Sequence, residues 1–206
     1  MNITLTVVAV AASVLGSGMA LPQALRLFRT GRTDGVSPVW IGVSVAINAW
    51  WAAYAVAVSL WTLLPVAVVS LLLYVWIGVV FLRVTRAALL PVIGGAFGLG
   101  MTPLPALLVG GWTVAGVTVG LCYGIQLAPA VAAAYRAPTV DGISPATWAI
   151  SFTEAALWLG YGVGIGDRAL VAGGVMGIVM AGAIIFRLAL PVVGSAVRLI
   201  RVGSAT

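Results

Sequence analysis

The chain has 206 residues, of which 63% are hydrophobic and 7% are charged, and its formal net charge at pH 7 is +6. Soluble domains carry roughly a quarter charged residues, so this composition excludes a fully water-exposed surface and predicts an integral membrane protein. All ten basic residues are arginines that lie singly or in short groups between apolar segments, which indicates membrane topology rather than a nucleic-acid surface. The chain has no histidine and a single cysteine, Cys122, which excludes a disulfide within the chain and zinc sites of cysteine and histidine.

Seven apolar segments follow one another along the chain, and each is long enough to cross a membrane, for which a helix needs about 20 apolar residues. Residues 1–20 lack a basic start and a clear cleavage site, so we assign them to the first span rather than to a cleaved signal peptide. Ser37-Pro38 and Ser144-Pro145 open the second and sixth segments, because serine caps free N–H groups and proline suits the first helical turn. The expected spans cover about residues 3–27, 37–59, 62–82, 88–109, 113–135, 144–166 and 169–190. Three prolines break the fourth of these spans: Pro91, Pro103 and Pro105.

One stretch of sequence occurs twice, at residues 21–40 (LPQALRLFRTGRTDGVSPVW) and at residues 128–148 (APAVAAAYRAPTVDGISPATW). Matching positions are separated by 107 residues without a gap, which indicates an internal duplication rather than chance. The matching pairs are Pro22 and Pro129, Arg29 and Arg136, Asp34 and Asp141, Ser37 and Ser144, Trp51 and Trp158, and Tyr54 and Tyr161. The duplication relates spans 1–3 to spans 5–7. The unmatched fourth span restores the chain direction, so both halves point the same way across the membrane, as in known parallel-repeat transporters.

We therefore predict an all-α integral membrane protein with seven transmembrane helices, arranged as two parallel triple-helix bundles joined by a linker helix. The expected parts are a first bundle (1–87), a linker helix (88–110), a second bundle (111–192) and a cytoplasmic tail (193–206). Nine of the ten arginines fall on one side of this arrangement, and only Arg168 falls on the other. Because arginine is enriched in cytoplasmic loops, this asymmetry predicts an N-terminus outside the cell membrane and a C-terminus in the cytoplasm.

Four side chains at intramembrane depth are the main candidates for binding a ligand. Trp51 and Trp158 lie too deep for the interfacial belt that tryptophan usually marks, and there each ring can stack on a sugar or another planar ligand. Asn48 lies one turn before Trp51. Glu154, four residues before Trp158, is the one carboxylate well inside a span, where it can hydrogen-bond a ligand, bind a cation or take up a proton. A hydrogen bond between helices is its structural alternative.

Other intramembrane residues have simpler interpretations. Ser70 in the third span and Gln126 in the fifth are weaker candidates, because serine and glutamine in spans more often join helices. Four further tryptophans fit the interfacial belt: Trp40, Trp61, Trp112 and Trp148. Glycines spaced four or so residues apart predict close approach of helix backbones in the second half: Gly116, Gly120, Gly124, Gly160, Gly164, Gly173 and Gly177.

Two matching prolines predict paired kinks late in the first and fifth spans. Pro22 and Pro129 each lie inside a helix, where proline removes a backbone hydrogen bond and bends the axis, although proline kinks are also common in membrane helices without a function. Pro38 and Pro145 are first-turn residues. All four prolines fall on the expected cytoplasmic side, where a gate would be. The sequence has no nucleophile–base pair, metal cluster or phosphate loop, so we expect neither an enzyme nor a cofactor or metal site.

The first copy of the repeat resembles the PQ-loop motif, in which a proline–glutamine pair, here Pro22-Gln23, ends the first helix of a three-helix unit. Two such units, a linker helix, seven spans and an external N-terminus together resemble the SWEET sugar transporters and their PQ-loop relatives. The resemblance covers nearly the whole chain. It implies two bundles around a central pathway and proline hinges near the cytoplasmic end, which Pro22, Pro38, Pro129 and Pro145 match.

The resemblance also implies a substrate site with paired tryptophans on the second helix of each unit, which Trp51 and Trp158 match. The family carries paired asparagines on the third helices, whereas this chain has Ser70 near that place in span 3 and small residues around Gly173 in span 7. The second copy of the motif has Ala128-Pro129-Ala130 in place of proline–glutamine. Related PQ-loop proteins move amino acids with protons, which an intramembrane glutamate would suit.

We therefore expect a facilitative uniporter that moves a small polar solute, and a mono- or disaccharide is the solute we expect first. Transport would occur by rocking of the two bundles around a central substrate site. The expected site residues are Asn48, Trp51, Ser70, Glu154 and Trp158. The alternatives are proton-coupled transport of an amino acid or other metabolite through Glu154, a ligand receptor without transport, and a structural membrane protein without a ligand. The expected partners are the solute and the lipid bilayer, without nucleic acid, and a homo-oligomer is allowed.

Overall fold

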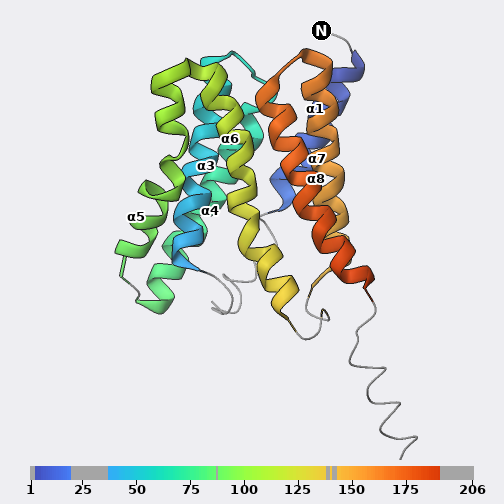
Figure 1. Ribbon diagram of the computed structural model, residues 1–206. Coiled ribbons are helices and arrows are strands. Elements are labelled where there is room, and N and C mark those ends of the chain that lie inside the picture. The colour runs from blue at the N-terminus through green and yellow to red at the C-terminus, as the bar shows by residue number, and fades with distance from the viewer. Residues whose placement is uncertain (1–2, 20–36, 87, 138–139, 141–142, 191–206) are drawn as a thin grey trace, which may run out of the picture.

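The computed structural model describes residues 3–19, 37–86, 88–137, 140 and 143–190, and these residues form helices joined by short connections. Figure 1 shows the helices standing side by side in one bundle, with the start of α1 at one end and the end of α8 at the other. The elements are α1 (Ile3–Met19), α3 (Pro38–Ala57), α4 (Leu64–Thr85), α5 (Leu90–Phe97), the 3-10 turn η1 (Leu99–Met101), α6 (Pro103–Arg136), α7 (Pro145–Ile165) and α8 (Arg168–Ala189).

The length and apolar composition of several helices are consistent with a membrane-embedded protein. Four helical stretches are long and apolar enough to cross a membrane: Pro38–Ala57, Leu64–Thr85, Leu90–Arg136 and Arg168–Ala189. Large apolar side chains face outward along these stretches, and the most exposed include Leu90, Phe97, Leu108 and Val109. Apolar surface of this extent is costly in water and is suited to lipid.

The helix starts follow the sequence closely. Ser37 precedes Pro38, and its hydroxyl accepts a hydrogen bond from the Trp40 N–H at 3.4 Å. Ser144 precedes Pro145 and accepts from the Thr147 N–H at 3.3 Å. Both predictions of a serine cap with a first-turn proline are confirmed, because each serine satisfies an N–H group that has no partner within its own helix.

The fourth expected span, residues 88–109, is interrupted near Pro103, as its prolines predict. Helix α5 ends at Phe97, η1 follows, and α6 begins at Pro103. Pro103 has no N–H to continue an incoming helix, so a new helix starts there. The indole N–H of Trp50 on α3 donates to the Gly100 carbonyl at 3.1 Å, which satisfies a backbone group that the break exposes.

A second interruption lies within the range of α6. Gly111 has φ 60° and ψ −160°, a conformation that side chains with a Cβ rarely adopt. Residues 103–110 therefore run toward the turn at Gly111, and Figure 1 shows the rest of α6 running back from it beside α3 and α8. The predicted start of a new helix near Thr113 is confirmed.

The contacts between helices form two matching groups. Helix α4 contacts both α1 and α3, and α8 contacts both α6 and α7. The two groups meet where α1 contacts α7 and where α3 contacts α6, while α5 packs on the outer side of α3. Gly95 of α5 lies against the Val39 backbone of α3, where an added Cβ would overlap the Val39 carbonyl. The α3–α5 pair is thus packed backbone to backbone.

The predicted close-packing glycines agree with the structure in most places. Gly120 of α6 lies against the backbone of Ala169 and Gly173 on α8, as expected for a helix–helix contact. The prediction of close helix packing at Gly160 is wrong, because a Cβ built there meets nothing within 4 Å. It faces away from the neighbouring helices, so its spacing from Gly164 carries no packing role.

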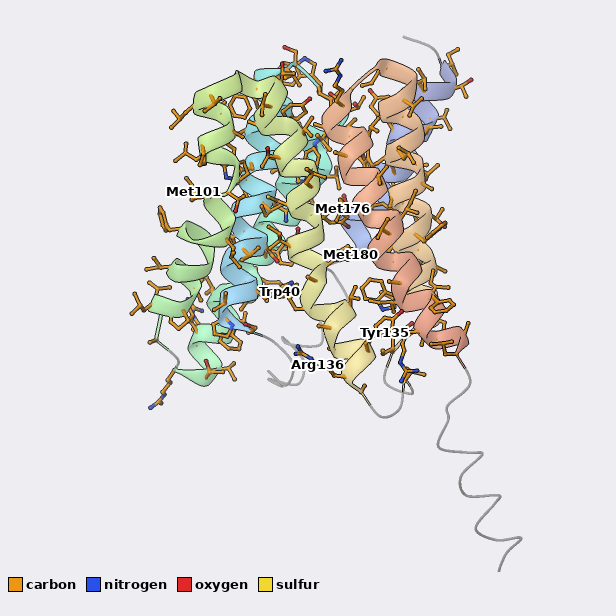
Figure 2. All side chains as sticks on the ribbon, in the orientation of Figure 1. Trp40, Met101, Tyr135, Arg136, Met176 and Met180 are labelled. Carbon is orange, nitrogen blue, oxygen red and sulfur yellow. The ribbon has the colours of Figure 1, made fainter. Side chains whose placement is uncertain are left out.

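Trp40 also makes contacts between helices. Its indole N–H donates to the Gln126 carbonyl of α6 at 3.0 Å, and its ring packs edge-to-face on Tyr74. The bond links the start of α3 to α6 one turn before Pro129, the proline inside that helix. Figure 2 shows Trp40 at the level where α3 and α6 lie beside each other. Trp61, in contrast, is 60% exposed at the α3–α4 connection, as a belt residue would be.

Candidate functional site

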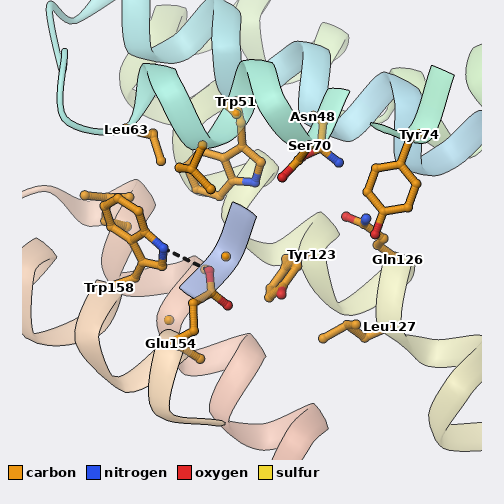
Figure 3. A pocket seen from close by; sticks show the side chains of 17 residues that line it. Asn48, Trp51, Leu63, Ser70, Tyr74, Tyr123, Gln126, Leu127, Glu154 and Trp158 are labelled. Carbon is orange, nitrogen blue, oxygen red and sulfur yellow. Dashed lines mark hydrogen bonds between the residues drawn. The ribbon is translucent and has the colours of Figure 1, made fainter. Parts of the chain in front are cut away.

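A cavity of about 120 Å³ lies between the two groups of helices. Figure 3 shows it from close by, with side chains from α3, α4, α6 and α7 pointing toward a common space. All five predicted substrate-binding residues line it. The lining residues are Gly16, Asn48, Trp51, Leu63, Val66, Ala67, Ser70, Tyr74, Tyr123, Gln126, Leu127, Glu154, Ala155, Trp158, Leu170, Gly173 and Gly174.

The two copies of the repeat contribute equivalent positions to the lining of the cavity. Twelve of its 17 lining residues form six pairs separated by 107 residues, the offset of the duplication. The pairs are Gly16 and Tyr123, Asn48 and Ala155, Trp51 and Trp158, Leu63 and Leu170, Val66 and Gly173, and Ala67 and Gly174. Both halves therefore contribute equivalent positions to one site. Two of the pairs are identical, the tryptophans and the leucines, and the other four differ in side chain, so the site is symmetric in position but asymmetric in its polar groups.

The tryptophan pair keeps the symmetry in its packing. Trp51 packs edge-to-face on Tyr54 with ring centroids 6.1 Å apart, and Trp158 packs on Tyr161 with centroids 6.0 Å apart. Each tyrosine is the residue one turn further along the same helix, so each half presents the same aromatic pair. Edge-to-face packing fixes the orientation of an aromatic ring, which leaves the rings of Trp51 and Trp158 beside the cavity.

Most polar side chains of the cavity have an apolar residue at the equivalent position in the other half. The indole N–H of Trp158 donates to Oε1 of Glu154 at 2.9 Å, whereas the residue equivalent to Glu154 is Ile47. Asn48 donates one amide N–H to the Ser44 carbonyl at 2.8 Å. The buried Oε2 of Glu154 has no hydrogen-bond partner. Glu154 is the one charged side chain among the residues that line the cavity.

No family model and no curated protein matches the chain. The family resemblance therefore rests on the repeated motif and on the order of the helices.

Beyond the tryptophans, two hydrogen bonds tie the halves together at the end that holds the α3–α4 and α7–α8 connections. Tyr54 donates to Oδ2 of Asp167 at 2.8 Å, and the Tyr161 hydroxyl bonds to Oγ1 of Thr62 at 2.8 Å. A buried apolar cluster surrounds both bonds and includes Leu63 and Leu170. The cavity is thus closed at this end by equivalent tyrosines, each reaching a connection in the other half.

Sequence reasoning missed three lining residues with a chemical or steric role. Tyr74 and Tyr123 carry hydroxyls on α4 and α6, and Gly16 lies against the carboxylate of Glu154. The repeat offset was the signal that would have found two of them, because Gly16 and Tyr123 are equivalent positions. Tyr74 has Ala181 as its equivalent, so the offset gives no indication of its place.

The predicted hinge residues are placed only in part. Pro129 lies inside α6 as predicted, and Pro38 and Pro145 lie in the first turns of α3 and α7. Pro22 and Gln23, which carry the motif in its first copy, lie outside the described residues. The described prolines line no part of the cavity, so any role they have in moving a solute is through the helices that carry them.

Proposed function

We propose that the chain is a seven-span membrane transporter that moves a small polar solute by alternating access. In this proposal α1, α3 and α4 form the first three-helix unit, the stretch from α5 to Gly110 is the linker span, and α6 from Trp112 with α7 and α8 forms the second unit. The observation that carries the proposal is a cavity between the two groups of helices to which six pairs of repeat-equivalent residues contribute. A static structural protein has no need of a cavity between its two halves that holds a buried carboxylate.

The contacts between the units support a rocking motion. The contact of α1 with α7 and the contact of α3 with α6 are equivalent under the repeat, because α6 matches α1 and α7 matches α3. Two equivalent contacts on either side of a central site allow one unit to tilt against the other while both contacts persist. Parallel repeats about an axis along the membrane normal are a known basis for such transport.

Charge at the helix ends supports the proposed orientation. Arg83, Arg86, Arg136 and Arg187 lie near the ends of α4, α6 and α8 at one end of the bundle, and Arg168 lies at the start of α8 at the other. The positive-inside rule then puts the four arginines in the cytoplasm and the Tyr54–Asp167 end outside, in a cell membrane. The described conformation would be closed to the outside.

A sugar is the first solute class to test, because the resemblance implies it and because Trp51 and Trp158 border the cavity with faces that suit a sugar ring. The test is uptake of labelled glucose and sucrose into proteoliposomes with the purified protein, with and without a pH gradient. Saturable flux that ignores the gradient supports facilitative uniport of a sugar. Trp51→Ala and Trp158→Ala should abolish it, and Trp61→Ala, at a 60% exposed site away from the cavity, is the matched control.

Proton-coupled transport of another metabolite is the second candidate, favoured by the unpartnered oxygen of Glu154 in the cavity. Flux that depends on the pH gradient and loses this dependence in Glu154→Gln would support it. Ligand binding without flux of any tested solute would point to a receptor on the same fold, and would remove transport as the function.

A further inference from the structure

One oxygen of the buried Glu154 carboxylate accepts a hydrogen bond, and the other oxygen has no hydrogen-bond partner. The Glu154 side chain is 7% exposed, its Oε1 accepts the Trp158 indole N–H at 2.9 Å, and its Oε2 has no partner. A Cβ built on Gly16 of α1 would lie 2.8 Å from Oε1, so the missing side chain at Gly16 makes the space that the carboxylate occupies. In Figure 3 the free oxygen points toward the space beside Tyr123.

Within the described part of the chain, no residue that lines the cavity carries a positive charge. The helices around it present Gly16 from α1, Asn48 and Trp51 from α3, and glycines from α8, none of which titrates. The titratable neighbours are Tyr74 of α4 and Tyr123 of α6, which are neutral when protonated. An ionised carboxylate at this depth is expensive without a counter-charge. The negative charge must therefore be neutralised from within the cavity, either by a proton that binds the carboxylate or by a bound cation that pairs with it.

The rest of the lining suits an organic cation better than a metal ion. Four aromatic side chains border the cavity, Trp51, Tyr74, Tyr123 and Trp158, and the faces of such rings attract ammonium groups. The volume of about 120 Å³ is below that of a cavity of about 150 Å³ that accommodates benzene. A small amine fits this space.

We propose that the cavity binds the ammonium group of a small organic amine, with the Glu154 carboxylate as its counter-ion, and that the amine displaces a proton from Glu154. This inference rests on the proposed transport function and names its solute. The amine enters as R–NH₃⁺, the carboxylic acid of Glu154 releases its proton to water, and an ammonium N–H donates to Oε2. One positive charge enters and one leaves, so the exchange is electroneutral. Because proton and amine need the same carboxylate, a carrier of this kind exchanges one for the other.

Calorimetric titration of the purified protein with n-butylammonium tests the inference directly. We expect binding at pH 8 with release of up to one proton, read from two buffers with different heats of ionisation. Binding should weaken toward pH 5.5, because protonation of Glu154 removes the site, by at most about tenfold per pH unit for a single proton. Glu154→Gln should bind at least about tenfold more weakly, since a hydrogen bond to a charged group is lost, and should release no proton.

A conservative variant and a second ligand separate the effect of charge from effects on folding and on hydrogen bonding. Glu154→Asp keeps a carboxylate one methylene shorter and should retain proton release with reduced affinity. The melting temperature of each variant shows whether it is folded. Tetramethylammonium, which has the charge but no N–H to donate, should bind more weakly than n-butylammonium, because it leaves Oε2 without a partner.

The inference is overturned if folded wild-type protein does not bind n-butylammonium, if Glu154→Gln binds it equally well, or if no proton is released at any pH. Glucose uptake that Glu154→Gln leaves unchanged, together with no amine binding, would overturn the inference and keep the transport function. Amine binding with proton release but no flux of amine or sugar into vesicles would keep the binding site and remove the transport function.

Discussion

The hydroxyl of Tyr54 donates a hydrogen bond of 2.8 Å to Oδ2 of Asp167, across 113 positions of sequence. Oδ1 of the same carboxylate accepts the Leu170 N–H at 2.9 Å, so Asp167 caps α8 with one oxygen and holds α3 with the other. The bond joins the two halves on the side of the cavity beyond Trp51. The proposed alternating access would require this bond to break when the cavity opens at this end.

Replacing Tyr54 with phenylalanine should favour conformations that are open at this end. The variant loses a hydrogen bond to a charged acceptor, worth about 1.5–3 kcal/mol, and so should shift the equilibrium by roughly tenfold or more. The measurement is the labelling rate of Ser70→Cys in a Cys122→Ser background with a membrane-impermeant maleimide, because Ser70 lines the cavity.

The matched control for this shift is Tyr135→Phe. Its hydroxyl also bonds between helices, to the Ala183 carbonyl at 3.0 Å, but near the opposite end of α6. This variant should leave the labelling rate from the outside unchanged. Equal rates in Tyr54→Phe and in the parent would mean that the Tyr54–Asp167 bond does not limit opening.

The repeat allowed the tryptophan pair of the cavity to be predicted from the sequence, and the reason is geometric. Equivalent positions in a symmetric arrangement approach the axis together, so the match of Trp51 with Trp158 already indicated a shared site. The structure puts both at the cavity, with Asn48 and Glu154 a turn earlier on the same helices. Ser-Pro pairs marked helix starts because capping is a local interaction that depends on neighbouring residues.

The features that the sequence did not predict depend on contacts between distant residues. The prolines predict a break in the fourth span, but not that the indole of Trp50 satisfies the Gly100 carbonyl there. The link of Trp40 to α6 needs the packing of α3 on that helix. Tyr54 looked like one half of a repeated pair, whereas its partner Asp167 has Leu60 as its equivalent. A pattern of spacing within one segment contains no information on such partners.

Gly16→Ala should displace the carboxylate of Glu154. A Cβ at this position would lie 2.8 Å from Oε1 of Glu154 and 3.0 Å from Cγ2 of Val66, closer than atoms pack without a shift. Overpacking of this kind costs about 1–3 kcal/mol. We expect a lower melting temperature and loss of solute binding that depends on Glu154.

Gly18→Ala is the control on the same helix, because a Cβ there meets nothing within 4 Å. It should leave binding intact and leave stability unchanged or slightly higher, since alanine favours a helix by up to about 1 kcal/mol over glycine. A Gly16→Ala protein with normal binding would show that the space beside Gly16 is not needed by the carboxylate.

The neighbouring glycines of α5 give a direct test of how the linker packs. Gly95→Ala would drive a Cβ into the Val39 carbonyl of α3, and neither group is the end of a flexible side chain, so the helices must separate. We expect a stability loss of about 1–3 kcal/mol. Gly94→Ala, one residue earlier, meets nothing within 4 Å and should be neutral. Thermal unfolding in detergent measures both, and equal melting temperatures would contradict the described α3–α5 contact.

Trp158→Phe and Trp51→Phe separate the aromatic faces of the site from the hydrogen bond beneath them. Each change keeps a ring beside the cavity, but only Trp158 donates to Glu154, while Ile47 holds the equivalent position below Trp51. Loss of the Trp158 N–H leaves both carboxylate oxygens of Glu154 without a partner in the protein, which costs about 1–3 kcal/mol. Trp158→Phe should therefore lower the melting temperature and weaken ligand binding about fivefold to a hundredfold.

Trp51→Phe should change binding by less than roughly threefold, within the usual range for a substitution that conserves an apolar face. Thermal unfolding and calorimetric titration give the two numbers, and similar losses in both variants would mean that the Trp158–Glu154 bond has no special part in the site.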